Sequence, residues 1–89
     1  MDKAIQKKAI RRLRIAAGQV KGLEKMVAEE KYCIDIINQS LAIKQALSSV
    51  EDLLLQNHLS SHVIMQMKNH QEAKAIKEIL SVYKLSKKK

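Results

Sequence analysis

The fold is decided by residues 31–68, KYCIDIINQSLAIKQALSSVEDLLLQNHLSSHVIMQMK, a stretch that holds neither glycine nor proline. Its apolar residues recur three or four positions apart, which is the spacing of an amphipathic helix. They are Ile36, Ile37, Leu41, Ile43, Leu47, Val50, Leu54, Leu55 and Leu59. The pattern predicts one long helix over residues 31–68.

The length of this helix predicts association between chains. Such a helix spans roughly 55 Å, whereas a compact chain of 89 residues has a radius of gyration of about 12 Å. Hydrophobic residues make up 46% of the sequence and aromatic residues 2%, so the core is aliphatic, as suits helices packed on helices. We expect one all-α domain, residues 1–89, with three helices, paired as an antiparallel four-helix-bundle dimer.

Shorter helices are predicted on both sides of the long one. Residues 3–28 repeat apolar side chains at helical spacing, and residues 28–31 are the expected turn. The apolar positions are Ile5, Ala9, Leu13, Ala16, Val20, Leu23 and Val27. Asn69 and Glu72 resemble a capping box, predicting a third helix from His70 to about Tyr83 and a basic tail after it. Ala73, Ile76, Ile79, Leu80 and Tyr83 form its apolar face.

Two glycines, Gly18 and Gly22, lie inside the first predicted helix. Each costs about 1 kcal/mol of helix stability relative to alanine. Close approach of another helix backbone would explain them.

The charge of the chain indicates a polyanionic partner. The formal net charge is +8, and the basic residues gather toward the two ends of the sequence. With a single cysteine, the chain forms no internal disulfide. Nothing resembles a signal peptide or a membrane span, so we expect a cytoplasmic protein without a membrane partner.

Three residues suggest a metal site shared between chains. His58 and His62 are four residues apart and therefore face one side of a helix, one turn apart. Cys33 precedes His58 by twenty-five residues, nearly seven whole turns, and lies about 37 Å away along a straight helix. Antiparallel pairing would bring Cys33 of one chain beside both histidines of the other, giving two intersubunit sites in a twofold dimer.

These motifs resemble the CsoR/RcnR family of bacterial metal-sensing repressors. The likeness rests on Tyr32-Cys33-Ile34-Asp35, on His58-Leu59 followed by His62, and on the GQVKGL stretch at residues 18–23. It implies an antiparallel helical dimer that pairs into a tetramer and carries no helix-turn-helix. It also implies that the metal-free tetramer binds operator DNA and represses transcription. The metal-bound form would release the DNA, which would derepress metal efflux or resistance genes.

The resemblance favours copper. Copper sensors of the family carry Cys, His and Cys, and His62 stands at the third position here. The nickel and cobalt branch does use Cys, His and His, but it adds a histidine near the N-terminus, and this chain has none before His58. A tyrosine and a glutamate that couple the copper site to DNA fall on Tyr32 and Glu78. Because a thiolate with two imidazoles suits trigonal Cu(I), we expect Cu(I), with Ni(II), Co(II) or Zn(II) as alternatives.

Operator DNA is expected to meet a basic surface on the first two helices. The resemblance carries over Arg12 and Lys44, and the basic stripe of the first helix adds Lys8, Arg14 and Lys21. The family motif is broken at residues 15 and 17, where isoleucine and alanine replace a basic and an acidic residue. Binding should depend steeply on salt and should read DNA shape more than base edges.

Other interpretations stay open at this level. Taken singly, a cysteine is commonly a small core residue, and paired histidines on a helix are commonly surface residues. The chain could sense an electrophile such as formaldehyde through Cys33, or could coat nucleic acid without any ligand. An enzyme is not expected, because no oxyanion hole or orienting third residue can be identified.

Overall fold

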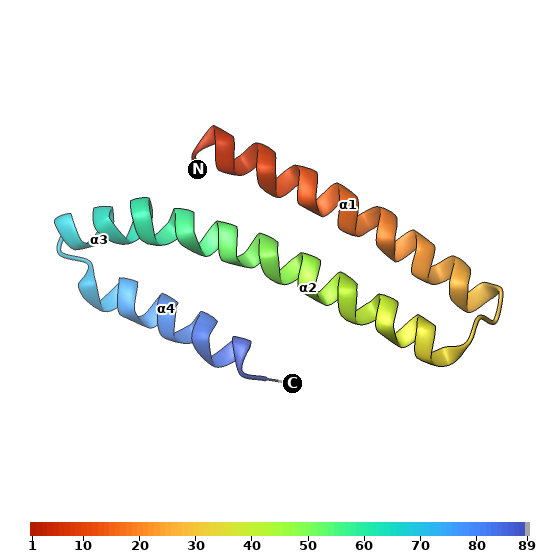
Figure 1. The fold of residues 1–89 in the computed structure, drawn as a ribbon. Coiled ribbons are helices and arrows are strands. Elements are labelled where there is room, and N and C mark those ends of the chain that lie inside the picture. The colour runs from red at the N-terminus through yellow and green to blue at the C-terminus, as the bar shows by residue number, and fades with distance from the viewer. Residues whose placement is uncertain (89) are drawn as a thin grey trace. The chain divides into compact units, whose positions relative to one another are not determined.

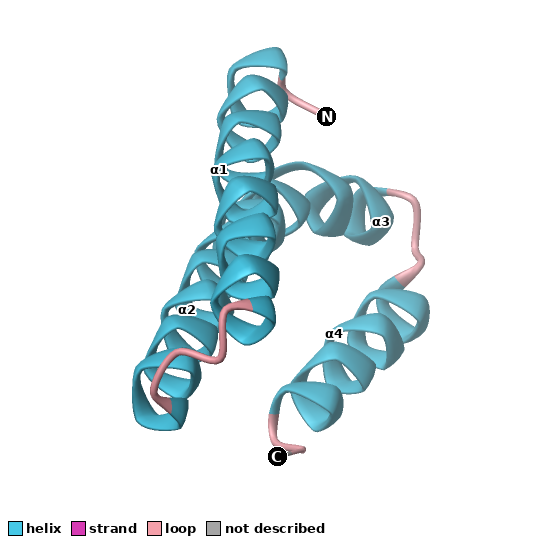
Figure 2. Cartoon of the chain, turned by 90° about the vertical axis from the view of Figure 1, so that its right-hand side faces the viewer, coloured by secondary structure: helices cyan, strands magenta, loops and turns pink. Residues whose placement is uncertain are grey.

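The computed structural model describes residues 1–88, and all regular structure in this part of the chain is helical (Figures 1 and 2). The elements are α1 (Lys3–Ala28), α2 (Cys33–Asn57), the π-helical segment η1 (His58–Val63), α3 (Ile64–Lys68) and α4 (Glu72–Ser86). Helical backbone runs without interruption over residues 33–68. The predicted all-α class with three helical stretches is therefore confirmed.

The chain divides into two compact units, Met1–Leu55 and Gln56–Lys89. In the first unit α1 and α2 lie side by side and run in opposite directions (Figure 1). Ala9 and Ala16 on α1 and Ile43 and Val50 on α2 are its buried residues. Their seven-residue spacing matches the seam of two helices packed at a shallow angle.

The seam of α1 keeps four of the seven positions of the predicted apolar stripe and leaves the other three exposed; the four are Ile5, Ala9, Ala16 and Leu23. Gln19 and Met26 are half-buried, while Leu13, Val20 and Val27 are 45%, 49% and 57% exposed. Burial therefore follows a line only partly shared with the predicted one. Leu13, Val20 and Val27 form a second apolar line on α1, and this line is exposed to solvent in the single chain.

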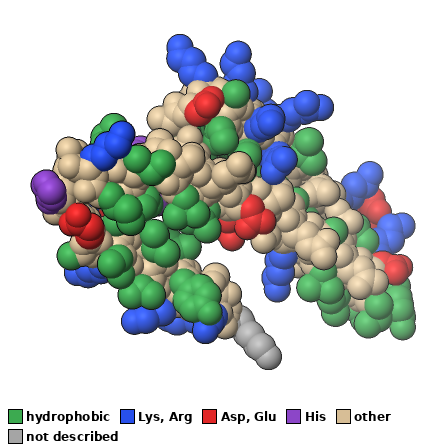
Figure 3. Space-filling model, turned by 60° about the vertical axis from the view of Figure 1, so that its left-hand side comes forward, with side chains coloured by type: hydrophobic (Ala, Val, Ile, Leu, Met, Phe, Trp, Pro, Cys, Tyr) green, Lys and Arg blue, Asp and Glu red, His purple; other side chains and the backbone are tan. Residues whose placement is uncertain are grey.

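The second unit contains η1, α3 and α4, and α4 packs back against α3. Val63 and Ala75 are its buried hydrophobic residues, and Ala75 is completely buried. Ile76, Leu80 and Tyr83, which the sequence placed on the apolar face of the last helix, are about half exposed. In Figure 3 hydrophobic side chains are visible across much of the face turned to the viewer.

Both turns between the helices use the same backbone motif. Glu30 and His70 adopt the left-handed conformation, with φ of 52° and 58°. After α1, the N–H of Lys31 bonds to the C=O of Met26 at 3.0 Å, and the N–H of Glu30 bonds to the C=O of Val27 at 3.1 Å. After α3, Gln71 bonds to Gln66 and His70 to Met67 in the same way. These are Schellman motifs built without glycine.

The predicted helix ends need three corrections. The long helix begins at Cys33 rather than at residue 31, because the C=O of Tyr32 accepts the first N–H groups of the helix, from Asp35 and Ile36. The capping box is wrong: Asn69 ends α3, and Gln71 precedes α4 without a side-chain hydrogen bond to the helix. The last helix therefore starts at Glu72, and it continues through Ser86, beyond the predicted end at Tyr83. Lys89 of the predicted tail lies outside the described residues.

Candidate metal site and basic surface

The two histidines lie next to each other in η1. The centroids of the His58 and His62 rings are 5.2 Å apart, and the ring planes are tilted by 52°. His58 is half-buried and His62 is exposed. No hydrogen bond or ion pair to either imidazole is found within residues 1–88, so their nitrogens are available to a ligand.

The separation of the rings can be tested against the needs of a metal ion. Metal–nitrogen bonds to histidine are about 2.0–2.1 Å, and the ring centroid lies about 1.1 Å behind the nitrogen, so two rings on one tetrahedral ion have centroids about 5 Å apart. The observed 5.2 Å agrees with this value. The distance between the rings is therefore compatible with one shared ion of the size and donor preference of copper or zinc.

The backbone around the histidines is a π-helix, in which N–H groups bond to carbonyls five residues earlier rather than four. Two serines lie between the histidines, and both donate their hydroxyls to the C=O of Asn57. The distances are 2.7 Å from Ser61 and 3.2 Å from Ser60. Asn57 is 5% exposed. Nothing in the apolar spacing of the sequence signalled this segment, because a single π-turn leaves the pattern close to that of an α-helix.

Cys33 is an exposed free thiol at the first residue of α2. Tyr32 precedes it with a side chain that is 69% exposed. Within residues 1–88 no group of three or more His, Cys, Asp or Glu side chains could hold a metal ion. The chain by itself supplies a histidine pair and no complete site.

Glu78 lies on α4 and bonds to a residue that the sequence did not single out. Its Oε1 accepts a hydrogen bond of 2.9 Å from Nε2 of Gln66, on α3. Gln66 follows His62 by four residues and is half-buried, and its own Oε1 is buried without a partner. The i, i+4 relation to His62 was the available signal, because such residues share a helix face.

The residues expected to contact DNA are all exposed: Lys8, Arg12, Arg14 and Lys21 on α1, and Lys44 on α2. They do not share one face. At about 100° per residue, Arg14 and Lys21 point away from the buried seam. Arg12 turns toward α2, where its Nη1 donates to the C=O of Ser49 at 3.1 Å.

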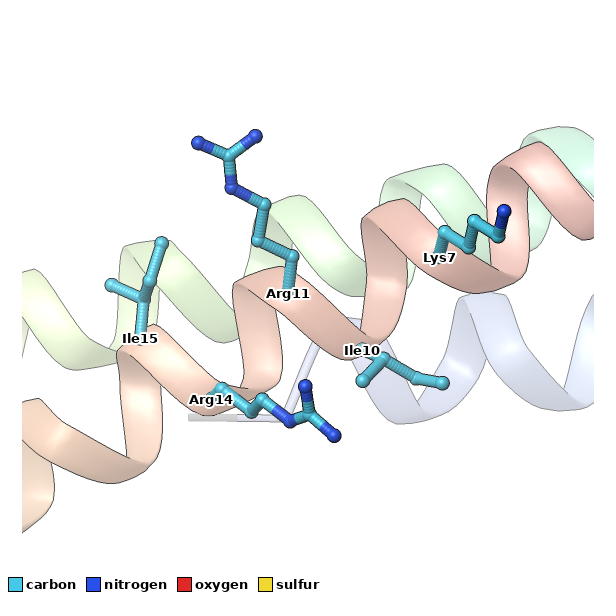
Figure 4. A pocket seen from close by; sticks show the side chains of 5 residues that line it. All are labelled: Lys7, Ile10, Arg11, Arg14 and Ile15. Atoms are coloured by element: carbon cyan, nitrogen blue, oxygen red, sulfur yellow. The ribbon is translucent and has the colours of Figure 1, made fainter.

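The outer face of α1 carries more positive charge than the predicted set. Lys7, Arg11 and Lys25 lie on the same side of the helix as Arg14 and Lys21, and we call these five residues the outer basic stripe. Lys7, Arg11 and Arg14 line a shallow hollow with two isoleucines, Ile10 and Ile15 (Figure 4). In Figure 4 Arg14 lies on the same side of the helix as Ile10, and Arg11 on the same side as Ile15.

The two glycines of α1 fall within the outer basic stripe. Gly18 and Gly22 are three residues before Lys21 and Lys25 of the stripe, and Gly18 is also four residues after Arg14. A Cβ atom built on either glycine would meet nothing within 4 Å. The close helix approach predicted from these glycines is therefore not found among residues 1–88 of a single chain.

An antiparallel helical chain with a histidine pair, a separate exposed thiol and a basic helix face has the architecture of an all-helical metal-responsive regulator. A family model described as metal-sensitive transcriptional repressor matches residues 5–84. The chain belongs to this family.

Similar proteins of known function are copper sensors. The chain is 37% identical over 73 residues to the copper-sensing transcriptional repressor CsoR of Bacillus subtilis, covering 82% of this chain and 72% of that protein. It is 50% identical over 50 residues to the copper-sensing repressor RicR of Mycobacterium tuberculosis, a match that covers 56% of this chain and 52% of that protein. These relatives are transcriptional repressors, not enzymes.

A solved structure shares the fold. The crystal structure of the copper-sensing repressor CsoR with Cu(I) from Geobacillus thermodenitrificans matches with a TM-score of 0.90 at 33% identity, covering 99% of this chain and 92% of that chain. Among the described residues, no helix is both long and apolar enough to cross a membrane.

Proposed function

We propose that this chain is a copper-responsive transcriptional repressor that binds operator DNA without metal and releases it when Cu(I) binds to Cys33, His58 and His62. The observation that carries the proposal is the histidine pair, whose ring separation of 5.2 Å suits one ion and whose nitrogens have no other partner within residues 1–88. Cu(I) prefers a thiolate with imidazoles in a site of low coordination number. The copper-sensing relatives support the choice of metal.

The third ligand would come from a partner chain. No single-chain cluster of three ligands occurs within residues 1–88, while Cys33 is exposed at one end of the helical stretch that carries the histidines. An antiparallel pairing of two chains would supply the thiol to each histidine pair. The exposed apolar side chains of α1 and α2 support such a pairing, because Val20 and Ile37 are 49% and 52% exposed.

DNA would lie against the outer basic stripe together with Lys8, Arg12 and Lys44. From Met1 to Leu23 the only acidic residue is Asp2, so the field over this face of α1 is positive. Arginines beside exposed isoleucines can hold phosphates while the apolar carbons contact sugars. Residues 1–89 would then form one domain that both senses metal and binds DNA. Tyr32 and Glu78 would couple metal binding to DNA binding.

Bound Cu(I) would supply a bond between chains that is absent without it. The residues of the chain would supply the remainder: the His58 and His62 rings lie 5.2 Å apart, and Glu78 on α4 accepts a hydrogen bond of 2.9 Å from Gln66 on α3. A change at His62 reaches Gln66 one helical turn later. Coupling between two sites of this kind is typically about 1–3 kcal/mol, a several-fold to hundredfold change in DNA affinity.

The test is an anaerobic Cu(I) titration against a competing chelator, read together with DNA release. We expect one Cu(I) per chain, with binding lost in Cys33→Ala and in His62→Ala, and with DNA released at the same stoichiometry. His70→Ala is the matched control, because His70 lies in the turn after α3 and is not part of the pair. Equal Cu(I) affinity in the wild type and Cys33→Ala would overturn the proposal, and the same release assay with Ni(II), Co(II), Zn(II) and formaldehyde would then identify the effector.

A further inference from the structure

The histidine pair is held by the segment between its two members. We propose that Ser60 and Ser61 are positioning residues for the metal site: their hydroxyls keep η1 in its π-helical form and so preset the distance between the His58 and His62 rings. This inference rests on the proposed function for its ligand, but the geometry that it concerns belongs to the metal-free chain.

The first step of the argument is the carbonyl that the serines share. In an α-helix the C=O of Asn57 would accept the N–H of the residue four positions later, which is Ser61. In a π-helix the partner is five positions later, which is His62. The hydroxyls of Ser60 and Ser61 bond to this same oxygen at 3.2 and 2.7 Å. They therefore compete with a backbone N–H for this oxygen.

The second step is the place of this carbonyl. Asn57 is the last residue of α2 and is 5% exposed, while the two serines that bond to its carbonyl are exposed on the helix surface. Hydroxyl groups inserted at a shared carbonyl are a known cause of local departures from α-helical geometry. The π-helical segment that follows begins at His58 and contains His62. Both candidate ligands thus lie in the part of the helix that the two serines modify.

The third step concerns the metal. A ligand pair that is already at the required separation loses less free energy on binding than one that must first be arranged. The rings are 5.2 Å apart in the chain without metal, the separation that one shared ion requires. The π-turn changes the direction in which residue 62 points relative to residue 58. Returning it to α-helix would change the rise and rotation between residues 58 and 62, and with them the preset ring separation, without removing either ligand.

The test uses the full chain and the double variant Ser60→Ala/Ser61→Ala, with Ser60→Thr/Ser61→Thr as the conservative variant that keeps both hydroxyls. Ser49→Ala is the matched control, because the Ser49 hydroxyl also bonds to a backbone carbonyl, that of Ala46 at 2.7 Å, but within ordinary α-helix. The first measurement is made without metal. Through-hydrogen-bond NMR couplings report whether the C=O of Asn57 is bonded to the N–H of His62 or of Ser61.

We expect the coupling to His62 in the wild type, the threonine variant and Ser49→Ala, and the coupling to Ser61 in the double alanine variant. The second measurement is Cu(I) affinity by chelator competition. The double alanine variant should bind about tenfold more weakly, the size expected from losing hydrogen bonds of ordinary strength, while the other two variants match the wild type.

Two results would overturn the inference. One is an unchanged His62 coupling in the double alanine variant, which would mean that the serines do not hold the π-turn. The other is wild-type Cu(I) affinity in a variant whose π-turn has been lost. Failure of the proposed function looks different: the wild type would then bind Cu(I) no better than Cys33→Ala, and the NMR measurement without metal would still decide whether the serines hold the turn.

Discussion

At the scale of single residues, Arg12 makes a structural contact in addition to the DNA contact that we propose for it. Its Nη1 donates to the C=O of Ser49 across the pair of helices α1 and α2. A guanidinium has five N–H donors, so this bond leaves others free for phosphate. Arg14 has no such contact within residues 1–88 and points away from the seam.

We therefore expect Arg12→Ala and Arg14→Ala to differ in stability rather than in DNA binding. Both should weaken DNA binding and reduce the slope of log affinity against log salt by about 1, as for the loss of one phosphate contact. Only Arg12→Ala should also lower the free energy of unfolding, by about 1 kcal/mol. Fluorescence anisotropy at several salt concentrations and thermal unfolding measure the two effects. Equal stability of the two variants would contradict the structural task of Arg12.

Replacing Gly18 distinguishes two explanations for this glycine: it is open to solvent, or another helix backbone covers it in the assembled protein. A Cβ at this position meets nothing within 4 Å in the chain, so Gly18→Ala should stabilise α1 by about 1 kcal/mol. Ala17→Gly, at the neighbouring exposed position, should lose a similar amount. Thermal unfolding of both variants is the measurement. A destabilised Gly18→Ala would mean that another backbone covers this glycine in the assembled protein, as the sequence suggested.

At the scale of elements, the helices themselves were predictable and their ends were not. The three-and-four spacing from Ile36 to Leu59 gives a helix whatever surrounds it, and the turn after Ala28 was confirmed. The turn after α3 was assigned to a capping box because no glycine marked the Schellman motif at His70. The π-turn was not predicted for a related reason: it is marked by hydroxyl groups that bond to one carbonyl and not by a pattern of apolar residues.

The strained turn residue gives a prediction at this scale. His70 has a φ of 58°, which costs a residue with a Cβ roughly 1 kcal/mol relative to glycine. His70→Gly should therefore raise the free energy of unfolding by about 0.5–1 kcal/mol, even though glycine gains freedom in the unfolded chain. Asn69→Gly is the control, because φ at Asn69 is −95° and no strain is relieved there. Chemical unfolding in urea compares the two variants, and a gain in the control alone would refute the explanation.

At the scale of the whole molecule, the single chain buries too few hydrophobic side chains to be expected to be stable as a monomer. Its buried hydrophobic residues are Ala9, Ala16, Ile43, Val50, Val63 and Ala75, and no large side chain within residues 1–88 is fully buried. A sequence can show that a helix is amphipathic, but the choice between its two apolar lines depends on which neighbour covers each. Leu13 and Val20 belong to the predicted apolar stripe of α1 and are nevertheless 45% and 49% exposed within the chain for this reason.

We expect unfolding to depend on protein concentration, because association would stabilise the folded chain by mass action. The midpoint of thermal unfolding should rise with concentration, and Val20→Glu on the open apolar line of α1 should reduce association. Lys7→Glu, on the outer basic stripe, should leave association unchanged while weakening DNA binding. Sedimentation equilibrium measures the first effect. A monomeric wild type with a concentration-independent midpoint would contradict the proposed pairing.

The small core of the single chain also has a consequence for the lifetime of this protein in the cell. A newly made chain that has not met a partner would open often, and open segments are the ones that proteases cut. Chains made in excess of their partners would be degraded, whereas assembled ones would persist. Degradation of unassembled chains would then limit the amount of the regulator. A twofold change in synthesis rate would change the abundance of the assembled form by more than twofold.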